Sequence, residues 1–539
     1  MNTLHCRTNG GGTGHQEPGE TAPGKACNWG TAPLPWLAPV VVGLVIRLAA
    51  AWVWEQQAGG RFVFGDSESY WLLARAIANG EEYRYGNARI FRMPGYPMVL
   101  APLFWLASPE PPHLWARFLG AGLGSVTILG VYFLAKQLFG QGVGLWSAWT
   151  CVFYPGAIAL SIFVLSEALF CPLVTLALVA GVKAAKSCRR APFVIWSGVA
   201  GVLHGLAILT RPSWLFFPMF AGVISIAFET RRLRQLAGFL VMIAGASAVL
   251  APWWVRNWCL TGRFVPATLQ TGASLYDGLH PGATGASDLS IVNRRMGELV
   301  VEFNRLFPEL TQPHLPGTTT GPMSFEEGSR LGGQAHAPNE QNGNYGKDEA
   351  SSEDGMSPGA ASGRLIEEKY EAGSMIAIPL VCGSVPADIR RQIALELFLD
   401  SRLRQEAIAW ALAHPREFLR LMLRKFVRLW NIWPNEAAFQ TPASRIVVAS
   451  TFLPLIICSV FGIIRHSRRG WAYVLPVLPA VYLTGIHCVF VSSLRYREPA
   501  MLALIPLAVA GAKSFWDLYR GTAGERAAPM AASHARANR

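Results

Sequence analysis

Long apolar runs recur along this chain from residue 35 to residue 513, and they constrain its fold more than any other feature. A helix of about 20 apolar residues can cross the hydrocarbon core of a bilayer. Hydrophobic residues make up 51% of the chain and charged residues only 15%, which favours a membrane protein over a soluble one. We predict an all-α polytopic protein with ten spans, at roughly 35–54, 114–138, 142–162, 167–183, 193–209, 213–228, 235–254, 446–464, 471–491 and 498–515.

Basic residues gather in the short connections between these runs. If both termini are cytoplasmic, three basic clusters fall on the cytoplasmic side, as the positive-inside rule requires: Lys183, Lys186, Arg189 and Arg190; Arg231, Arg232 and Arg234; and Arg465, Arg468 and Arg469. The net charge of +13 therefore reflects membrane topology, and nucleic acid is not an expected partner. The first loop, the 161–167 and 210–212 turns, segment 255–445 and the 492–499 turn then share the outer face of a plasma or inner membrane.

Composition divides the chain into five parts. Residues 1–33 and 517–539 are expected to be disordered cytoplasmic ends, because they lack the apolar surface needed for a core. Residues 34–257 form an N-terminal transmembrane module with its first outer loop at 55–113, and residues 446–516 form a C-terminal transmembrane module. Between them, the extracytoplasmic segment 258–445 contains a polar stretch at about 308–363, which is expected to be a disordered insertion.

An amphipathic basic helix is predicted at about 414–432, where apolar residues recur at three- and four-residue steps with arginines between them. Such a helix could lie along lipid headgroups or pack on the bundle with a solvated basic face, and the pattern favours neither. The nine cysteines include no pair with metal-ligand spacing, and no disulfide framework is implied.

An acidic cluster follows the first span, where the chain leaves the membrane. A helix is predicted at about 67–79, with Tyr70 on its apolar face and Gly80 as its terminator. Asp66 occupies the expected N-cap, where a carboxylate is oriented and still accessible, so it could cap the helix, act as a base, or do both. Glu68 points away from Asp66 on an ideal helix and is a lesser candidate.

Several cations are expected on the same outer face. Arg92 precedes two prolines and a glycine that turn the backbone back toward the membrane, and its planar fork suits a phosphate. Snorkelling to the headgroups explains any single cation of this kind but explains their convergence less easily. The others are Arg211, Arg256, Lys425, Arg495 and Arg497.

One oriented carboxylate beside several arginines fits sugar transfer from a lipid-linked phosphosugar. Phosphate is already a good leaving group, so one base and a cationic clamp suffice, whereas most glycoside hydrolases need two carboxyl groups. Asp66 would deprotonate an acceptor hydroxyl that attacks the anomeric carbon with inversion. Glu167 could orient Arg92, hold a divalent ion together with Asp66, or cap the fourth span. No metal ligand is assigned, and a divalent cation is a possibility only.

Seven short motifs in this order resemble the GT-C glycosyltransferases, in the branch of the dolichyl-phosphate-mannose protein mannosyltransferases and the aminoarabinose transferases. They are GDSESY at 65–70, RMPGYP at 92–97, LSE at 165–167, LTRP at 209–212, PWWVRN at 252–257, LYDG at 275–278 and RYREP at 495–499. The resemblance implies a GT-C-like bundle with extracytoplasmic loop helices and a polyprenyl-phosphate sugar donor. It also implies that Asp66 is the catalytic acid of the first outer loop and that Arg92 contacts the donor phosphate, where other members have lysine.

Three other functions are compatible with these features. A transporter or lipid-sugar flippase would also have about ten spans, but no internal repeat is evident and no acidic or basic residue is expected at the centre of a span, His204 being the nearest case. A ligase that transfers a whole lipid-linked glycan and a non-catalytic assembly subunit are the others. The acceptor, a hydroxyl of a glycolipid, glycan or protein, is not specified by any motif.

Overall fold

The computed structural model describes residues 35–107, 109–311, 386–435 and 439–537. Within these ranges the chain is helical, and its one β-type pairing is an isolated bridge between Tyr85 and Ala88. The N-terminal residues 1–33 and most of the predicted insertion at 308–363 lie outside the described residues. Of that insertion, only the short helix α14 (Pro308–Thr311) is described.

Eight helical segments in the described ranges are long and apolar enough to cross a membrane. They contain α1 (Leu37–Ala58), α5 (His113–Phe139), α8 (Glu167–Lys186), α9 (Arg190–Thr210), α11 (Arg232–Thr261), α18 with η4 (Pro442–Arg469), α19 to α20 (Trp471–Val489) and η6 with the first part of α21 (Leu494–Arg520). These segments account for eight of the ten predicted spans, and the fold class predicted from the sequence is confirmed.

The other two predicted spans differ from straight membrane helices. The run at 142–162 forms two helices, α6 (Gln141–Phe153) and α7 (Pro155–Ile162), which meet at an angle of 59°. The break falls at Pro155, whose ring removes an amide donor from the helical ladder. The run at 213–228 forms a shorter apolar segment, Pro212–Phe228, which contains α10 (Phe217–Phe228).

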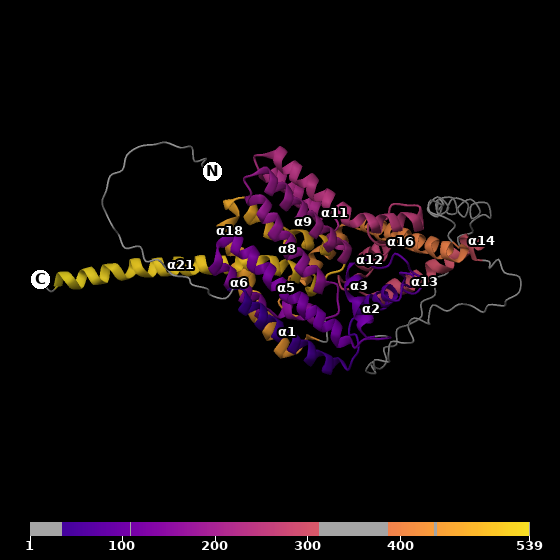
Figure 1. Cartoon of the computed structure of the whole chain (residues 1–539), viewed down its shortest axis with the longest axis horizontal. Helices are drawn as coiled ribbons and strands as arrows, with labels where there is room; N and C mark the ends of the chain where they lie inside the picture. The colour runs from indigo at the N-terminus through magenta and orange to yellow at the C-terminus, as the bar shows by residue number, and fades with distance from the viewer. Residues whose placement is uncertain (1–34, 108, 312–385, 436–438, 538–539) are drawn as a thin grey trace.

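Glycines allow the main helices of the bundle to approach closely. A Cβ at Gly201 or Gly205 of α9 would collide with the backbone of α11, and a Cβ at Gly462 of α18 would collide with the backbone of α21. Inside a bilayer, helices associate through close packing because the hydrophobic effect does not drive them together. Small residues at the crossings make this close packing possible. The bundle occupies the centre of the molecule in Figure 1, where α5, α8, α9 and α11 lie side by side.

Further helices, from the first loop and the long outer segment, extend the bundle at one end. The first loop contains α2 (Gly65–Ala78), α3 (Gly95–Leu100) and α4 (Pro102–Leu106), and the long outer segment contains α12 (Thr271–Gly278), α13 (Leu289–Leu306), α16 (Ala387–Ala413) and α17 (Pro415–Leu429). A separate apolar core, which includes Leu299, Phe303 and Phe398, joins α13 to α16. Figure 1 shows α12 and α13 beside α2 and α3, and Glu396 of α16 accepts hydrogen bonds from the backbone of Arg89 and Ile90 in the first loop.

The predicted amphipathic helix is present as α17, and it has both an inner and an outer apolar face. Leu421, Lys425 and Leu429 are buried against the protein, whereas Leu419 and Leu423 are exposed. At the C-terminus, α21 (Glu498–Ala537) continues far beyond residue 516 and projects from the bundle in Figure 1. The alanine-rich sequence after residue 526 is compatible with this helix, because alanine has the highest helix propensity.

Candidate active site at the outer end of the bundle

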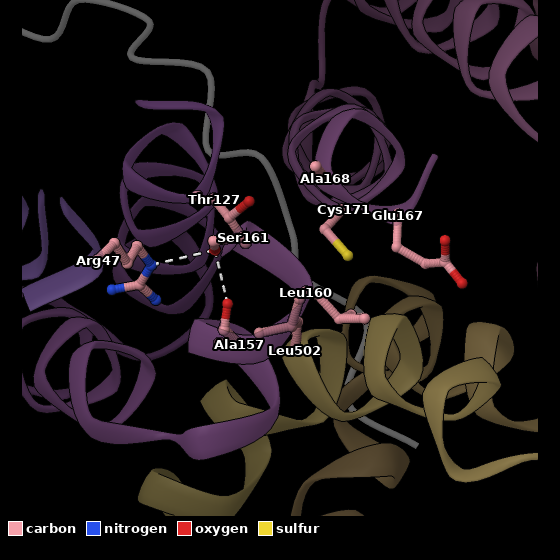
Figure 2. Close-up of a pocket in the computed structure, with 10 residues that line it drawn as sticks. Arg47, Thr127, Ala157, Leu160, Ser161, Glu167, Ala168, Cys171 and Leu502 are labelled. Atoms are coloured by element: carbon pink, nitrogen blue, oxygen red, sulfur yellow. Dashed lines mark hydrogen bonds between the residues drawn. The ribbon is translucent and has the colours of Figure 1, made fainter. Parts of the chain in front are cut away.

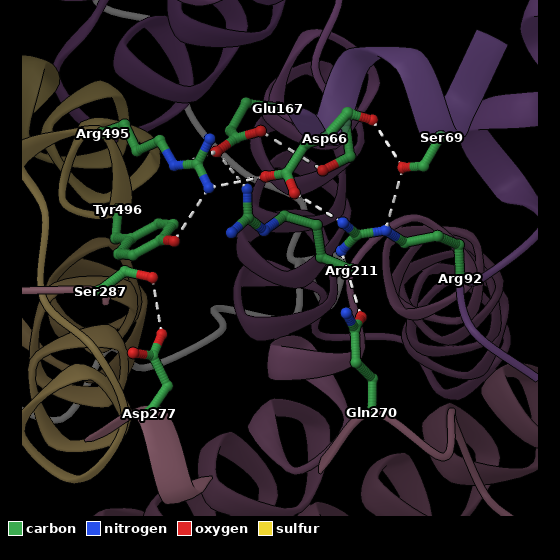
Figure 3. Close-up of polar contacts among 11 residues, drawn as sticks. Asp66, Ser69, Arg92, Glu167, Arg211, Gln270, Asp277, Ser287, Arg495 and Tyr496 are labelled. Carbon is green, nitrogen blue, oxygen red and sulfur yellow. Dashed lines mark hydrogen bonds and ion pairs between the residues drawn. The ribbon is translucent and has the colours of Figure 1, made fainter. Parts of the chain in front are cut away.

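Asp66 lies between two arginines that come from opposite ends of the chain (Figure 3). Its Oδ1 accepts a hydrogen bond from Arg92 Nη2 at 2.6 Å, and its Oδ2 accepts one from Arg495 Nη2 at 2.8 Å. The Asp66 side chain is 30% exposed and the two arginine side chains are 19% and 26% exposed. The carboxylate is therefore fixed by two charge-assisted contacts and still open to a ligand.

Helix α2 presents Asp66 from its first turn. The helix begins at Gly65 after Phe64 and has no side-chain cap, so the expectation that Asp66 is the N-cap is not met. Its carboxylate is instead held by the guanidinium groups. Tyr70 is buried on the predicted apolar face, and Gly80 has a φ of 68°, the left-handed conformation expected of a helix terminator.

Arg92 precedes α3 in the chain, and its guanidinium is held by contacts with several segments. Its Nε donates to Ser69 Oγ at 3.3 Å and its Nη1 donates to Gln270 Oε1 at 3.3 Å. Its guanidinium lies 5.4 Å from the ring centroid of Tyr70 and 4.7 Å from that of Phe91. The charge of Arg92 is thus placed by α2, by the first loop and by the segment before α12.

A second ion pair, between Glu167 and Arg211, lies next to Asp66. Glu167, at the first position of α8, forms an ion pair with Arg211, and its Oε1 lies 3.8 Å from Arg495 Nε. No side-chain capping bond is seen at the start of α8, so Glu167 does not cap this helix. It orients arginines instead, and these are Arg211 and Arg495, not the expected Arg92. Arg495 Nη2 also donates to Tyr496 Oη at 2.9 Å. Arg495 therefore joins the Asp66 pair to the Glu167 pair.

The electrostatics favour an ionised Asp66. Burial raises the pKa of its carboxyl group, but the charges of Arg92 and Arg495 outweigh burial and lower the pKa to about 2. Asp66 and Glu167 also both lie at helix N-termini, where the helix dipole favours negative charge. Three arginines around two carboxylates leave one unit of positive charge in the site.

Three residues predicted for the site lie outside the network around Asp66. Glu68 is exposed on the far side of α2. Arg256 Nη2 donates to the carbonyl oxygens of Tyr83 and Arg89, so it braces the first loop. Arg497 is buried and donates to the carbonyl oxygen of Leu429 at 3.2 Å and to that of Asn431.

Four further residues complete the site and were not singled out from the sequence. Ser69 and Gln270 bind Arg92, Tyr496 binds Arg495, and His487 stacks on Tyr496 with ring centroids 4.2 Å apart. Tyr496 stands between the two arginines of the RYREP motif, which is the one local signal that could have identified it. Gln270 and His487 have no comparable signal, because only the fold brings Gln270 to Arg92 and His487 to Tyr496.

Two sequence-based expectations need correction. Arg47 lies at the middle of α1 and is fully buried, so a charged residue does occupy the centre of a span. One arginine changes the hydropathy of a long apolar run only slightly, so the run still predicts an uncharged span centre. Cys259, near the end of α11, is disulfide-bonded, although no disulfide was expected.

Among the described residues, no group of three or more His, Cys, Asp or Glu side chains could hold a metal ion.

Comparison with protein families gives one match. Residues 110–255 match the profile of the dolichyl-phosphate-mannose-protein mannosyltransferase family. The matched segment runs from just before α5 into α11 and includes Glu167 and Arg211 of the site. The match confirms the resemblance to GT-C glycosyltransferases that the motifs indicated. No curated protein sequence matches the chain.

Two solved structures that this chain matches are an archaeal oligosaccharyltransferase and ArnT. The archaeal oligosaccharyltransferase AglB from Archaeoglobus fulgidus, in complex with an inhibitory peptide and a dolichol-phosphate, is 12% identical with a TM-score of 0.46. The alignment covers 91% of this chain and 52% of AglB, so the chain spans about half the length of that protein. ArnT from Cupriavidus metallidurans, bound to undecaprenyl phosphate, is 14% identical with a TM-score of 0.38, and the alignment covers 90% of this chain and 79% of ArnT.

Proposed function

We propose that this chain, a membrane protein of the GT-C glycosyltransferase type, moves a hexose or pentose from a polyprenyl-phosphate donor to a hydroxyl group with inversion of configuration. The acceptor would be a glycolipid, a glycan or a protein on the extracytoplasmic side. The observation that carries the proposal is the Asp66 carboxylate held between Arg92 and Arg495. The family match supports glycosyl transfer independently of this geometry.

The arginines would bind the phosphate of the donor. Arg92, Arg211 and Arg495 are all partly exposed, and each guanidinium can bind two oxygen atoms at once. The site has one net positive charge after Asp66 and Glu167 are counted, which matches the single negative charge of a phosphodiester. The same groups would stabilise the negative charge that grows on the departing lipid phosphate.

Donor binding would also activate Asp66. A carboxylate with a pKa of about 2 is ionised at neutral pH but is a weak base. A phosphate that recruits Arg92 and Arg495 would draw their charge away from Asp66 and raise its pKa. Asp66 would then accept the proton of the acceptor hydroxyl only when the donor is in place.

Several features support an extracytoplasmic site. Helix α8 begins at Glu167 in the site and ends at Lys186 in a basic cluster, and its 20 residues span roughly 30 Å, the thickness of a hydrocarbon core. The cluster therefore lies at the opposite end of the bundle, where the positive-inside rule places the cytoplasm. The disulfide-bonded Cys259 is on the site side of α11, and disulfides persist in oxidising compartments.

A transfer assay with Asp66→Asn tests the proposal. The variant keeps the shape of the side chain and removes its charge, so transfer from a panel of polyprenyl-phosphate sugars into membrane extracts should fall by at least about 100-fold, the lower range for general-base loss. Glu68→Gln, on the same helix but exposed, is the matched control and should retain activity. Full activity of Asp66→Asn would exclude Asp66 as the base.

A lipid-sugar flippase is the second candidate, because Arg47 lies in the middle of α1 and buried intramembrane charges often mark transport pathways. Purified protein in vesicles distinguishes the two functions. A flippase would move a polyprenyl-phosphate sugar between leaflets without forming a new glycoside, whereas a transferase would form product only in the presence of acceptor.

A further inference from the structure

Arg47 is a buried cation whose described contacts are all with neutral oxygen atoms. Its Nε donates to Ser161 Oγ at 3.2 Å, its Nη1 to the Gly43 carbonyl oxygen at 3.2 Å and its Nη2 to the Cys151 carbonyl oxygen at 3.1 Å. Within the described residues no acidic side chain forms a salt bridge with it. A charge in the hydrocarbon region is costly, so such contacts call for a specific role.

The Cys151 carbonyl is an acceptor that the helix itself cannot satisfy. In an α-helix the carbonyl of residue 151 accepts from the amide of residue 155. Residue 155 is proline and has no amide hydrogen, so the carbonyl would be left unpaired inside the membrane. Arg47 supplies the missing donor. It therefore stabilises the end of α6 at the point where the chain bends by 59°.

Arg47 also fixes the other half of the bend. Ser161 lies at the end of α7, accepts from Arg47 and donates to the Ala157 carbonyl oxygen at 2.6 Å (Figure 2). Gly124 of α5 makes room for this contact, because a Cβ there would collide with both Ser161 and Arg47. One guanidinium thus connects α1, α6 and α7.

The end of α7 leads directly into the candidate active site. Six residues after Ser161, Glu167 begins α8 and binds Arg211 beside Asp66. Figure 2 shows Arg47, Ser161 and Glu167 around one pocket, with Glu167 on the far side from Arg47. Any change in the angle between α6 and α7 would move Glu167, and Arg495 would move with it because Arg495 lies beside both Glu167 and Asp66.

We propose that Arg47 is a positioning residue that holds the bend between α6 and α7 and thereby places Glu167 against Arg211 and Arg495. This inference rests on the proposed function, since Glu167 matters to catalysis only if the site transfers sugar. Arg47 itself does not touch substrate in this scheme. It acts on the reaction by replacing the amide that Pro155 lacks and by holding Ser161.

A double-mutant cycle tests the proposal. Arg47→Gln and Ser161→Ala are measured in the wild-type background and in Glu167→Gln, with rates expressed per folded, monodisperse protein. Ser125→Ala is the matched control, because Ser125 also makes a buried bond to its own helix backbone, to the Ala121 carbonyl, without contacting Arg47. In the wild-type background Arg47→Gln should lower kcat by about tenfold to a hundredfold, as expected for a displacement of about 1 Å in an active site.

Ser161→Ala should also lower kcat, whereas Ser125→Ala should not. In the Glu167→Gln background Arg47→Gln should have little further effect, because both changes act through the same contact. Equal losses in both backgrounds, or wild-type activity of Arg47→Gln, would overturn the positioning role.

A structural measurement separates this inference from the proposed function. Cryo-electron microscopy of Arg47→Gln in nanodiscs should show a changed angle between α6 and α7 and a broken pair between Glu167 and Arg211. That result would support the positioning role even if no sugar is transferred by any variant. An unchanged angle with the pair intact would reject it.

Discussion

At the scale of single residues, arginines a few positions apart have unrelated roles. Arg495 reaches the Asp66 carboxylate, whereas Arg497 points into the bundle and donates to backbone carbonyls. The two flank Tyr496 at the end of a short 3₁₀-helix, η6 (Leu494–Tyr496), in which residues two apart face different directions. The motif thus shows that cations are present without showing which of them binds the ligand.

Replacing Arg92 by lysine should weaken donor binding more than it affects turnover. Lysine keeps the charge but cannot reach Asp66, Ser69 and Gln270 together as the guanidinium does. The loss of one charge-assisted hydrogen bond, roughly 1.5–3 kcal/mol, predicts an increase in donor KM of about tenfold to a hundredfold.

Steady-state kinetics against donor concentration measure this change, with the exposed Arg84→Lys as the control. If Arg92→Lys shows a normal donor KM, donor binding does not depend on the planar fork of Arg92.

At the scale of elements, the backbone of the first loop is attached to the outer helices at Glu396. Glu396 of α16 accepts from the backbone N–H groups of Arg89 at 2.5 Å and of Ile90 at 3.1 Å. The Ile90 carbonyl in turn accepts from the amide of Leu269, next to Gln270. Arg92 is therefore placed partly by a helix that is more than 290 residues away in the sequence.

This junction should depend on pH. Burial raises the pKa of Glu396 to about 7, although the N–H groups of Arg89 and Ile90 lower it. The folded protein therefore holds this proton more tightly than the unfolded chain. Stability should be highest below the ordinary glutamate pKa and should fall as the pH rises toward 7, by about 1.4 kcal/mol for each unit at most.

Thermal unfolding in detergent between pH 4.5 and 8 measures this effect. Glu396→Gln should flatten the part of the pH dependence that comes from this group, and Asp388→Asn, exposed on the same helix, should leave it unchanged. If wild type and Glu396→Gln have the same pH profile, Glu396 does not titrate in this range.

At the scale of the whole molecule, the site and the basic clusters lie at opposite ends of the bundle. Asp66, Arg92 and Glu167 occupy one end, and Lys186 lies at the other end of α8. Two segments separated by 429 residues meet at Asp66, which requires the first and last modules to pack together. The C-terminal helix α21 contributes to this packing through its buried first half.

Opposite accessibility of two engineered cysteines tests this topology. Arg84→Cys in the first loop and Leu233→Cys near the basic cluster replace exposed side chains at the two ends. A membrane-impermeant thiol reagent applied to intact cells should label Arg84→Cys and should reach Leu233→Cys only after permeabilisation.

The unsubstituted protein gives the background of its native cysteines. Labelling of Leu233→Cys in intact cells, with Arg84→Cys protected, would place the site in the cytoplasm.

Much of this architecture could be predicted from the sequence. Spans, basic connections, the helix that begins near Asp66 and its end at Gly80 follow from hydropathy, charge and glycine conformation, which act over a few residues to about 20. Asp66, Arg92, Glu167, Arg211 and Arg495 were all predicted as site residues, and the structure brings them together.

Other features were decided only by the tertiary structure. The contact of Arg495 with Asp66, the bracing role of Arg256, the contribution of Gln270 and the bend held by Arg47 depend on segments between 100 and 430 residues apart. A local pattern cannot encode such pairings, because a guanidinium can donate to a carboxylate, a backbone carbonyl or a lipid phosphate alike. The packing of helices determines which of these acceptors is within reach, and thereby separates the arginines of the site from those that support the fold.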